Sequence, residues 1–122
     1  MDNTIKELKV YSVAVQLSDL AWEIFKLIPK QFQYSTGDQF IRAIDSVAAN
    51  ISEGHGRFSY KERLHYTRIA RGSLYESSHW FEVICKRFTI PPEKQKVFIS
   101  LLRNEGFLLN QYGRYLQNKA IK

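Results

Sequence analysis

The chain has 122 residues, of which 44% are hydrophobic and 14% are aromatic. A chain of this length forms one continuous core, and this composition excludes a disordered protein, so we expect a single domain over residues 1–122. The formal net charge of +6 favours attraction to polyanions. Residues 57–88 carry seven Lys or Arg against three Glu, and residues 89–122 carry six against two. We therefore expect the basic surface to lie in this part of the chain.

Three features of the sequence favour a cytoplasmic protein that does not enter a membrane. No apolar run approaches the ~20 residues that span a bilayer, and the segment MDNTIKELKV has no apolar signal core. The single Cys85 cannot form a disulfide within the chain, which suits a reducing compartment.

Apolar residues at steps of three and four predict a first helix over residues 4–28. Pro29 disfavours helical backbone in the residue before it, so we expect the helix to end there. The predicted buried stripe of this helix is Val10, Ala14, Leu17, Ala21, Ile24 and Ile28.

A second helix is predicted over residues 37–54. Thr36 and Gln39 have the spacing of a capping box at its start, and Gly54 or Gly56 is expected to end it in the left-handed conformation. Its predicted core residues are Phe40, Ile44, Val47, Ala48 and Ile51.

Two further helices are predicted over residues 60–88 and 92–119. Ser59 and Glu62 form a capping-box pair before the third helix, and Pro92 suits the first turn of the fourth. Short connections between four amphipathic helices predict an all-α fold, an antiparallel up-down-up-down four-helix bundle. The predicted core residues are Tyr66, Ala70, Leu74, Ser77, Phe81, Ile84 and Phe88 in the third helix and Phe98, Leu101, Leu102, Leu108, Leu109, Tyr112 and Leu116 in the fourth.

The third helix also has a basic face. At ~100° per residue, seven of its residues fall within a narrow arc: Lys61, His65, Arg68, Gly72, Tyr75, His79 and Lys86. Guanidinium and ammonium groups neutralise phosphates, and a tyrosine can stack on an unpaired base. The candidate nucleic-acid-binding residues are Arg57, Lys61, Arg63, His65, Arg68, Arg71 and Tyr75. Such a face is also typical of a solvated helix or of a subunit interface in which Arg pairs with Glu of a neighbour.

The second helix carries a polar line with steps of three or four residues. Its members are Gln39, Arg42, Ser46, Asn50 and Glu53. Buried polar groups must be paired, and Arg57, Arg71 and the Gly72-Ser73 backbone offer partners. We interpret the line as a structural hydrogen-bond network that fixes the register of the helices.

Metal-binding and catalytic patterns are weak. Glu62 with His65 and Glu76 with His79 form two Glu-x-x-His motifs, but both lie on one helix about 21 Å apart and cannot share a metal within one subunit. The Arg-to-His intervals are longer than those of HEPN-type nucleases, and no converging set of acid, base and nucleophile is present. We expect no enzyme activity, no catalytic residue, no metal and no cofactor.

The segment GDQFIRAIDSVAANISEGHGRFSYKERLHYTRIARGSLYE resembles the signature of four-helix bundle proteins of the 23S rRNA intervening-sequence family. Weaker similarity extends over nearly the whole chain. The matching positions are Gln39, Arg42, Ser46, Asn50, Ile51, Glu53, Gly54, Gly56, Arg57, Ser59, Ala70, Gly72, Ser73, Leu74 and Glu76.

The resemblance implies an all-α bundle that assembles as a homo-oligomer, often a pentamer. A related accessory protein of diversity-generating retroelements binds nucleic acid and a reverse transcriptase, so the resemblance implies RNA or DNA, or such a protein, as partners. No catalytic residue is implied. From the residues and the resemblance together we expect a non-enzymatic oligomeric bundle that binds nucleic acid; the alternative is a protein-interaction scaffold or assembly subunit that binds none.

Overall fold

The computed structural model describes residues 5 and 8–121. Its four long helices are α2 (Lys9–Leu27), α4 (Asp38–His55), α5 (Tyr60–Arg87) and α6 (Pro92–Ile121). A short helix, α3 (Lys30–Phe32), and a π-helical turn, η1 (Gln33–Gly37), join α2 to α4.

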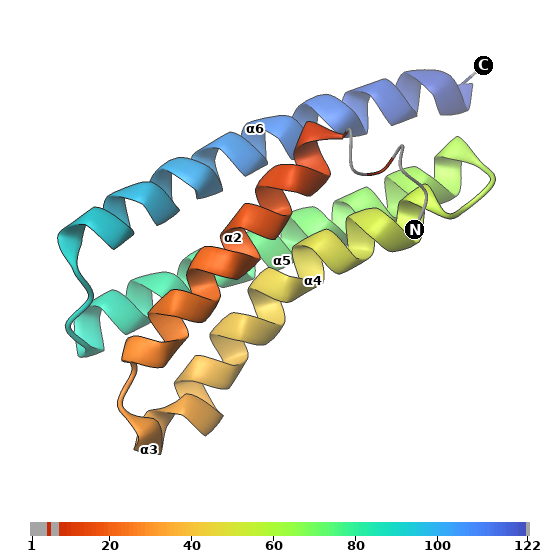
Figure 1. Ribbon diagram of the computed structural model, residues 1–122. Helices are drawn as coiled ribbons and strands as arrows, with labels where there is room; N and C mark the ends of the chain where they lie inside the picture. The colour runs from red at the N-terminus through yellow and green to blue at the C-terminus, as the bar shows by residue number, and fades with distance from the viewer. Residues whose placement is uncertain (1–4, 6–7, 122) are drawn as a thin grey trace.

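Successive long helices run in opposite directions, and the start of α2, the α4–α5 connection and the end of α6 lie at the same end of the molecule (Figure 1). The described part of the chain contains no strand. The predicted all-α, antiparallel four-helix bundle is therefore confirmed. None of the described helices is long and apolar enough to cross a membrane.

Proline and extended backbone set the ends of α2. Ile28 is extended at ψ 133°, and the helix ends before Pro29, as the proline rule requires. At the other end Leu8 is extended at ψ 118°, so α2 begins at Lys9 and not at residue 4. Thr4 itself lies outside the described residues.

The capping interactions predicted for the two ends of the second helix were wrong, although its bounds were close to those of α4. Thr36 does not cap α4, because the chain passes from α3 through η1 into α4 with helical backbone, and Gly37 has φ −62° and ψ −44°. Backbone groups in this continuous turn satisfy one another, so no side-chain cap is needed. No described residue has a positive φ; Gly56 has φ −77°, so the helix does not end in the left-handed conformation.

The predicted cap of the third helix is confirmed. The backbone N–H of Glu62 donates to Ser59 Oγ at 3.1 Å, and the Ser59 hydroxyl donates to Glu62 Oε2 at 3.3 Å. This cap fixes the point where the chain turns from the α4–α5 connection into α5.

The core lies along the bundle axis and contains the predicted stripes. Every residue of the stripe predicted for the first helix is buried. Seven core residues predicted for the other helices are only partly buried: Ala48, Tyr66, Phe88, Leu101, Leu102, Leu108 and Tyr112. Three phenylalanines from different helices meet at its centre: the ring centroids of Phe81 and Phe98 are 4.5 Å apart, and those of Phe40 and Phe98 are 5.5 Å apart.

The helices α4 and α5 approach each other closely near Gly54. A Cβ atom at Gly54 would lie 2.8 Å from Tyr66 Cβ and 3.2 Å from the Arg63 carbonyl oxygen. Glycine is therefore required at this position by space and not by backbone dihedral angles. Further along, the hydroxyls of Ser46 and Ser73 join the two helices at 2.9 Å.

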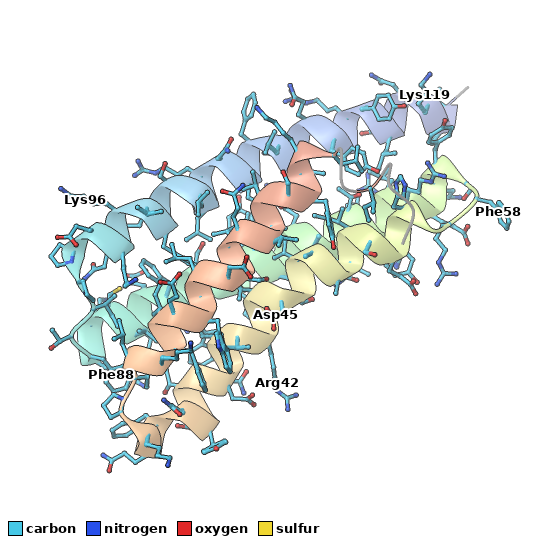
Figure 2. All side chains as sticks on the ribbon, in the orientation of Figure 1. Arg42, Asp45, Phe58, Phe88, Lys96 and Lys119 are labelled. Carbon is cyan, nitrogen blue, oxygen red and sulfur yellow. The ribbon has the colours of Figure 1, made fainter. Side chains whose placement is uncertain are left out.

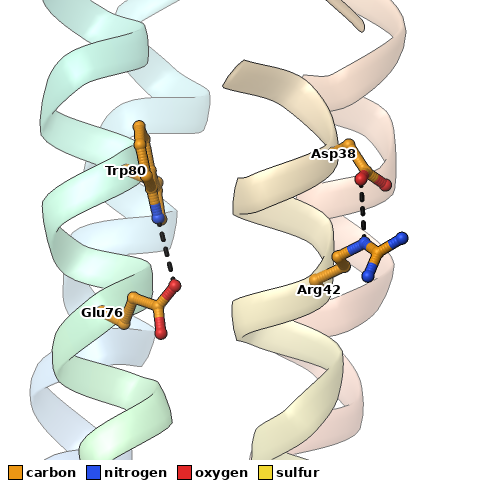
Figure 3. Close-up of polar contacts among 4 residues, drawn as sticks. All are labelled: Asp38, Arg42, Glu76 and Trp80. Carbon is orange, nitrogen blue, oxygen red and sulfur yellow. Dashed lines mark hydrogen bonds and ion pairs between the residues drawn. The ribbon is translucent and has the colours of Figure 1, made fainter. Parts of the chain in front are cut away.

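The polar line of α4 forms an internal network only in part. Asn50 Nδ2 donates to the Ser46 carbonyl at 2.8 Å and to Ser46 Oγ at 2.9 Å, and Ser46 reaches Ser73. Gln39, Arg42 and Glu53 are exposed. Arg42 donates to Asp38 one turn earlier, as Figure 3 shows. The helix period placed these residues on one side of α4, but that side is partly open to solvent. Arg42 and Glu53 therefore bond to residues four positions away in the sequence, Asp38 and Arg57.

Figure 2 draws the side chains on the four long helices, and one acidic side chain among the described residues is fully buried. Glu105 of α6 is 0% exposed, and neither of its carboxyl oxygens has a hydrogen-bond partner among the described residues. Burial raises the pKa of Glu105 from 4.5 to about 9, so the group is neutral at neutral pH.

Candidate nucleic-acid interface

A basic cavity of about 320 Å³ lies between α5 and α6. Three guanidinium groups and two side-chain amides reach it, and none of the described residues that line it is acidic. We call it the basic groove; its lining residues are Leu64, Thr67, Arg68, Arg71, Leu109, Asn110, Gly113, Arg114 and Gln117.

Glycines on α6 leave room between the two helices. A Cβ atom at Gly113 would contact Leu64 Cδ1 of α5 at 3.9 Å, and one at Gly106 would contact Leu74 Cδ2 at 3.8 Å. Gly113 and Leu64 line the basic groove, whereas Gly106 and Leu74 line a second hollow between the same two helices. The sequence thereby produces a groove where ordinary side chains would fill the space.

Arg71 is held in place on the wall of the basic groove. Its Nε donates to Asn110 Oδ1 at 2.9 Å, and its Nη2 donates to Tyr75 Oη at 3.2 Å. Its guanidinium carbon lies 4.9 Å from the centroid of the Tyr75 ring, within the range of a cation–π contact. These contacts orient the guanidinium group before any ligand arrives, which reduces the entropic cost of binding.

Arg68 and Arg114 face the same groove from opposite walls and are both exposed. Within the described residues, neither side chain makes a hydrogen bond or an ion pair. A guanidinium group has five N–H donors in a planar fork that matches two phosphate oxygens. The groove therefore combines one oriented arginine with two whose donors are not used by the described part of the protein.

The other predicted interface residues lie elsewhere. Arg57 donates to Glu53 Oε1 at 3.1 Å and to Tyr66 Oη at 2.9 Å, and the Nε of Arg63 donates to the Arg57 carbonyl at 2.9 Å. These contacts stabilise the connection between α4 and α5. Lys61 and His65 are exposed on α5 and do not line the groove. Of the predicted residues, the structure thus brings together Arg68, Arg71 and Tyr75.

Sequence reasoning missed the wall that α6 contributes. Asn110, Arg114 and Gln117 follow one another at steps of four and three, which places them on one face of a helix. Gly106 and Gly113 are seven residues apart on a neighbouring face. The spacing and the excess of positive charge after residue 88 were visible signals, but only the packing of α6 against α5 shows which face meets Arg68.

Groups suited to a metal ion are absent from the part of the chain that the structure describes: no three or more His, Cys, Asp or Glu side chains come together there. His65 and His79 instead contact neighbouring aromatic rings, with centroid distances of 5.3 Å to Tyr66 and 4.9 Å to Trp80.

Fold and groove define a small all-α protein, a four-helix bundle with a basic groove between its last two helices. Residues 6–111 match the family described as "23S rRNA-intervening sequence protein". Because this match covers most of the chain, the protein belongs to that family.

A solved structure has the same fold. It is the crystal structure of a protein with unknown function from the S23 ribosomal protein family from Bacteroides thetaiotaomicron. The two chains align with a TM-score of 0.63 and 18% sequence identity, over 93% of this chain and 99% of the other. Among curated protein sequences, none matches this chain.

Proposed function

We propose that this protein is a non-enzymatic, homo-oligomeric bundle that binds RNA or DNA through the basic groove. The observation that carries the proposal is the convergence of Arg68, Arg71 and Arg114 on one cavity, with no acidic side chain among its described lining residues. Nucleic-acid backbones present a regular array of phosphates, and arginines that neutralise them release condensed counterions. An oligomer repeats the groove and adds these weak contacts together.

Replacing both Arg68 and Arg114 by Gln tests the proposal. Neither guanidinium supports the fold through a hydrogen bond or ion pair among the described residues, so the variant should unfold at the same temperature as the wild type. We expect its affinity for labelled RNA and DNA to fall by about ten- to a hundredfold at low ionic strength, and the slope of log affinity against log salt to decrease by about 1.4 to 1.8. Fluorescence anisotropy over a salt series measures both.

A double replacement of Lys26 and Lys30 by Gln is the matched control. It removes the same charge from exposed positions in α2 and α3, away from the groove. Equal loss of affinity in the two variants, or no binding by the wild type at low salt, would contradict the proposal.

A protein-interaction scaffold is the second candidate, and side chains of α4 and α5 favour it. Arg42 of α4 is exposed and Trp80 of α5 is partly buried, and the Trp80 indole donates to Glu76 at 3.3 Å (Figure 3). Tryptophan and arginine are enriched at protein interfaces. Glu substitutions at Arg68 and Arg71 separate the candidates. The nucleic-acid proposal expects binding to vanish while the oligomer mass from light scattering stays constant; dissociation of the oligomer would favour the scaffold.

A further inference from the structure

A second hollow lies between α5 and α6. This hollow has a volume of about 260 Å³ and is mostly apolar, with Arg103 as its charged lining residue. Because Arg71 lines the basic groove and binds Tyr75 of the second hollow at 3.2 Å, the two spaces adjoin. The second hollow is lined by Leu74, Tyr75, Ser78, Leu102, Arg103 and Gly106.

Tyr75 presents an aromatic ring at the point where the two spaces meet. Its side chain is 61% exposed, and the Arg71 guanidinium carbon lies 4.9 Å from the centroid of its ring. Stacking on an aromatic ring suits any nucleobase, since every base has a π-face. On α5 the stacking platform therefore lies one helical turn from Arg71 and two turns from Arg68.

Gly72 leaves the backbone of α5 uncovered between Arg68 and Tyr75. It is exposed in the middle of a helix, and a Cβ atom there would meet nothing within 4 Å. Glycine at such a position costs about 1 kcal/mol relative to alanine, and no packing constraint in the bundle requires it. Its absent side chain allows a ligand to lie close against the helix between the arginine and the tyrosine.

We propose that the groove binds single-stranded nucleic acid in preference to a duplex. The backbone phosphates contact Arg68 and Arg114, and an unpaired base stacks on Tyr75 and enters the second hollow. In a duplex the bases are paired and stacked inside, so a duplex reaches the arginines with its phosphates but leaves the ring and the apolar hollow unused. This inference rests on the proposed function and adds to it the class of nucleic acid.

Competition between strands tests the preference. Labelled oligouridine, labelled oligothymidine of the same length and the oligoadenine–oligothymine duplex are titrated with the whole protein at one low salt concentration. We expect both single strands to bind at least about tenfold more tightly than the duplex, because only they use the stacking platform. The two single strands show whether the protein distinguishes this RNA from this DNA; a preference for either one is consistent with the inference.

Substitutions at Tyr75 test the stacking directly. Tyr75→Ala is expected to weaken single-strand binding about tenfold and to weaken duplex binding much less, because Asn110 still holds Arg71 in the variant. Tyr75→Phe loses the bond from Arg71 but keeps the ring, so it should bind single strands nearly as the wild type does. Tyr34→Ala is the matched control, because Tyr34 is 85% exposed in η1 and distant in the chain from the groove.

The outcomes distinguish this inference from the proposed function. Equal or tighter binding of the duplex, or an unchanged affinity of Tyr75→Ala for single strands, would overturn the single-strand inference while the effect of Arg68 and Arg114 on phosphate binding stood. If no nucleic acid bound at low salt, both the proposed function and the single-strand inference would be wrong.

Discussion

Replacing Glu105 by Gln is expected to stabilise the protein, and the gain should grow with pH. Burial raises the pKa of Glu105 from 4.5 to about 9, and no hydrogen bond from a described residue compensates for the lost hydration. The glutamine amide has nearly the same shape and cannot ionise. At about pH 7.5 we expect the free energy of unfolding of the variant to exceed that of the wild type by about 4 kcal/mol.

The sign follows from proton linkage. Between pH 4.5 and about 9 the folded protein keeps the proton on Glu105, whereas the unfolded chain has released it. The folded state therefore binds more protons, and the stability of the wild type falls as pH rises through this window, by about 1.4 kcal/mol per pH unit from this group alone. Below pH 4.5 the carboxyl is neutral in both states, and the two proteins should differ little through ionisation.

Urea unfolding at equal protein concentrations over a pH series measures the difference between the two proteins. Glu93→Gln is the control, because Glu93 lies exposed in the first turn of the same helix and should leave the pH dependence unchanged. Parallel curves for the wild type and Glu105→Gln across the whole window would show that the buried carboxyl is compensated within the folded protein, and the prediction would fail.

Patterns confined to one helix predicted the fold well. The stripe from Val10 to Ile28 depends only on the helical period and on the need to bury apolar surface, and the bundle buries all of it. Pro29 and Pro92 act on their own backbone and their immediate neighbours, so they mark helix ends independently of the rest of the chain. Sequence reasoning is reliable where the physics is local.

Features that depend on two helices could not be predicted in the same way. Thr36 and Gln39 have a capping-box spacing, yet the continuous turn through η1 leaves no end to cap. Arg68 was predicted from its own helix, but its partner Arg114 follows only from how α6 packs on α5. Arg57 lies outside the lining of the groove, and its guanidinium donates to Glu53, a partner that the sequence had offered, and to Tyr66, which only the packing of α5 reveals.

Two glycine-to-alanine substitutions are expected to change stability in opposite directions. Alanine is favoured over glycine in a helix interior by about 1 kcal/mol. At Gly72, where a Cβ atom would meet nothing within 4 Å, this preference acts alone, so Gly72→Ala should stabilise the protein by about 0.5–1 kcal/mol.

At Gly54 steric overlap outweighs the helix preference. The new Cβ atom would lie 2.8 Å from Tyr66 Cβ, which is fixed to the backbone of α5 and cannot rotate away. The two helices must separate, and that movement strains the bond between Ser46 and Ser73 at 2.9 Å. Overpacking of this kind costs about 1–3 kcal/mol, so we expect Gly54→Ala to lower the free energy of unfolding by about 2 kcal/mol and Gly54→Val to lower it further.

Urea unfolding of the variants at one pH checks this pair of predictions. The difference between the unfolding free energies of Gly72→Ala and Gly54→Ala is more informative than the value for either variant alone. Both substitutions add the same methyl group to a helical glycine, so changes in the unfolded chain are shared and largely cancel. If the two changes in unfolding free energy have opposite signs, glycine at position 54 is needed for the close approach of α4 to α5. Glycine at position 72 would then serve a purpose outside the packing of the bundle, such as a ligand that lies against the backbone of α5. Stabilisation by both substitutions would show that the approach of the helices at Gly54 is not tight in solution, and steric exclusion would then not be the reason for glycine at that position.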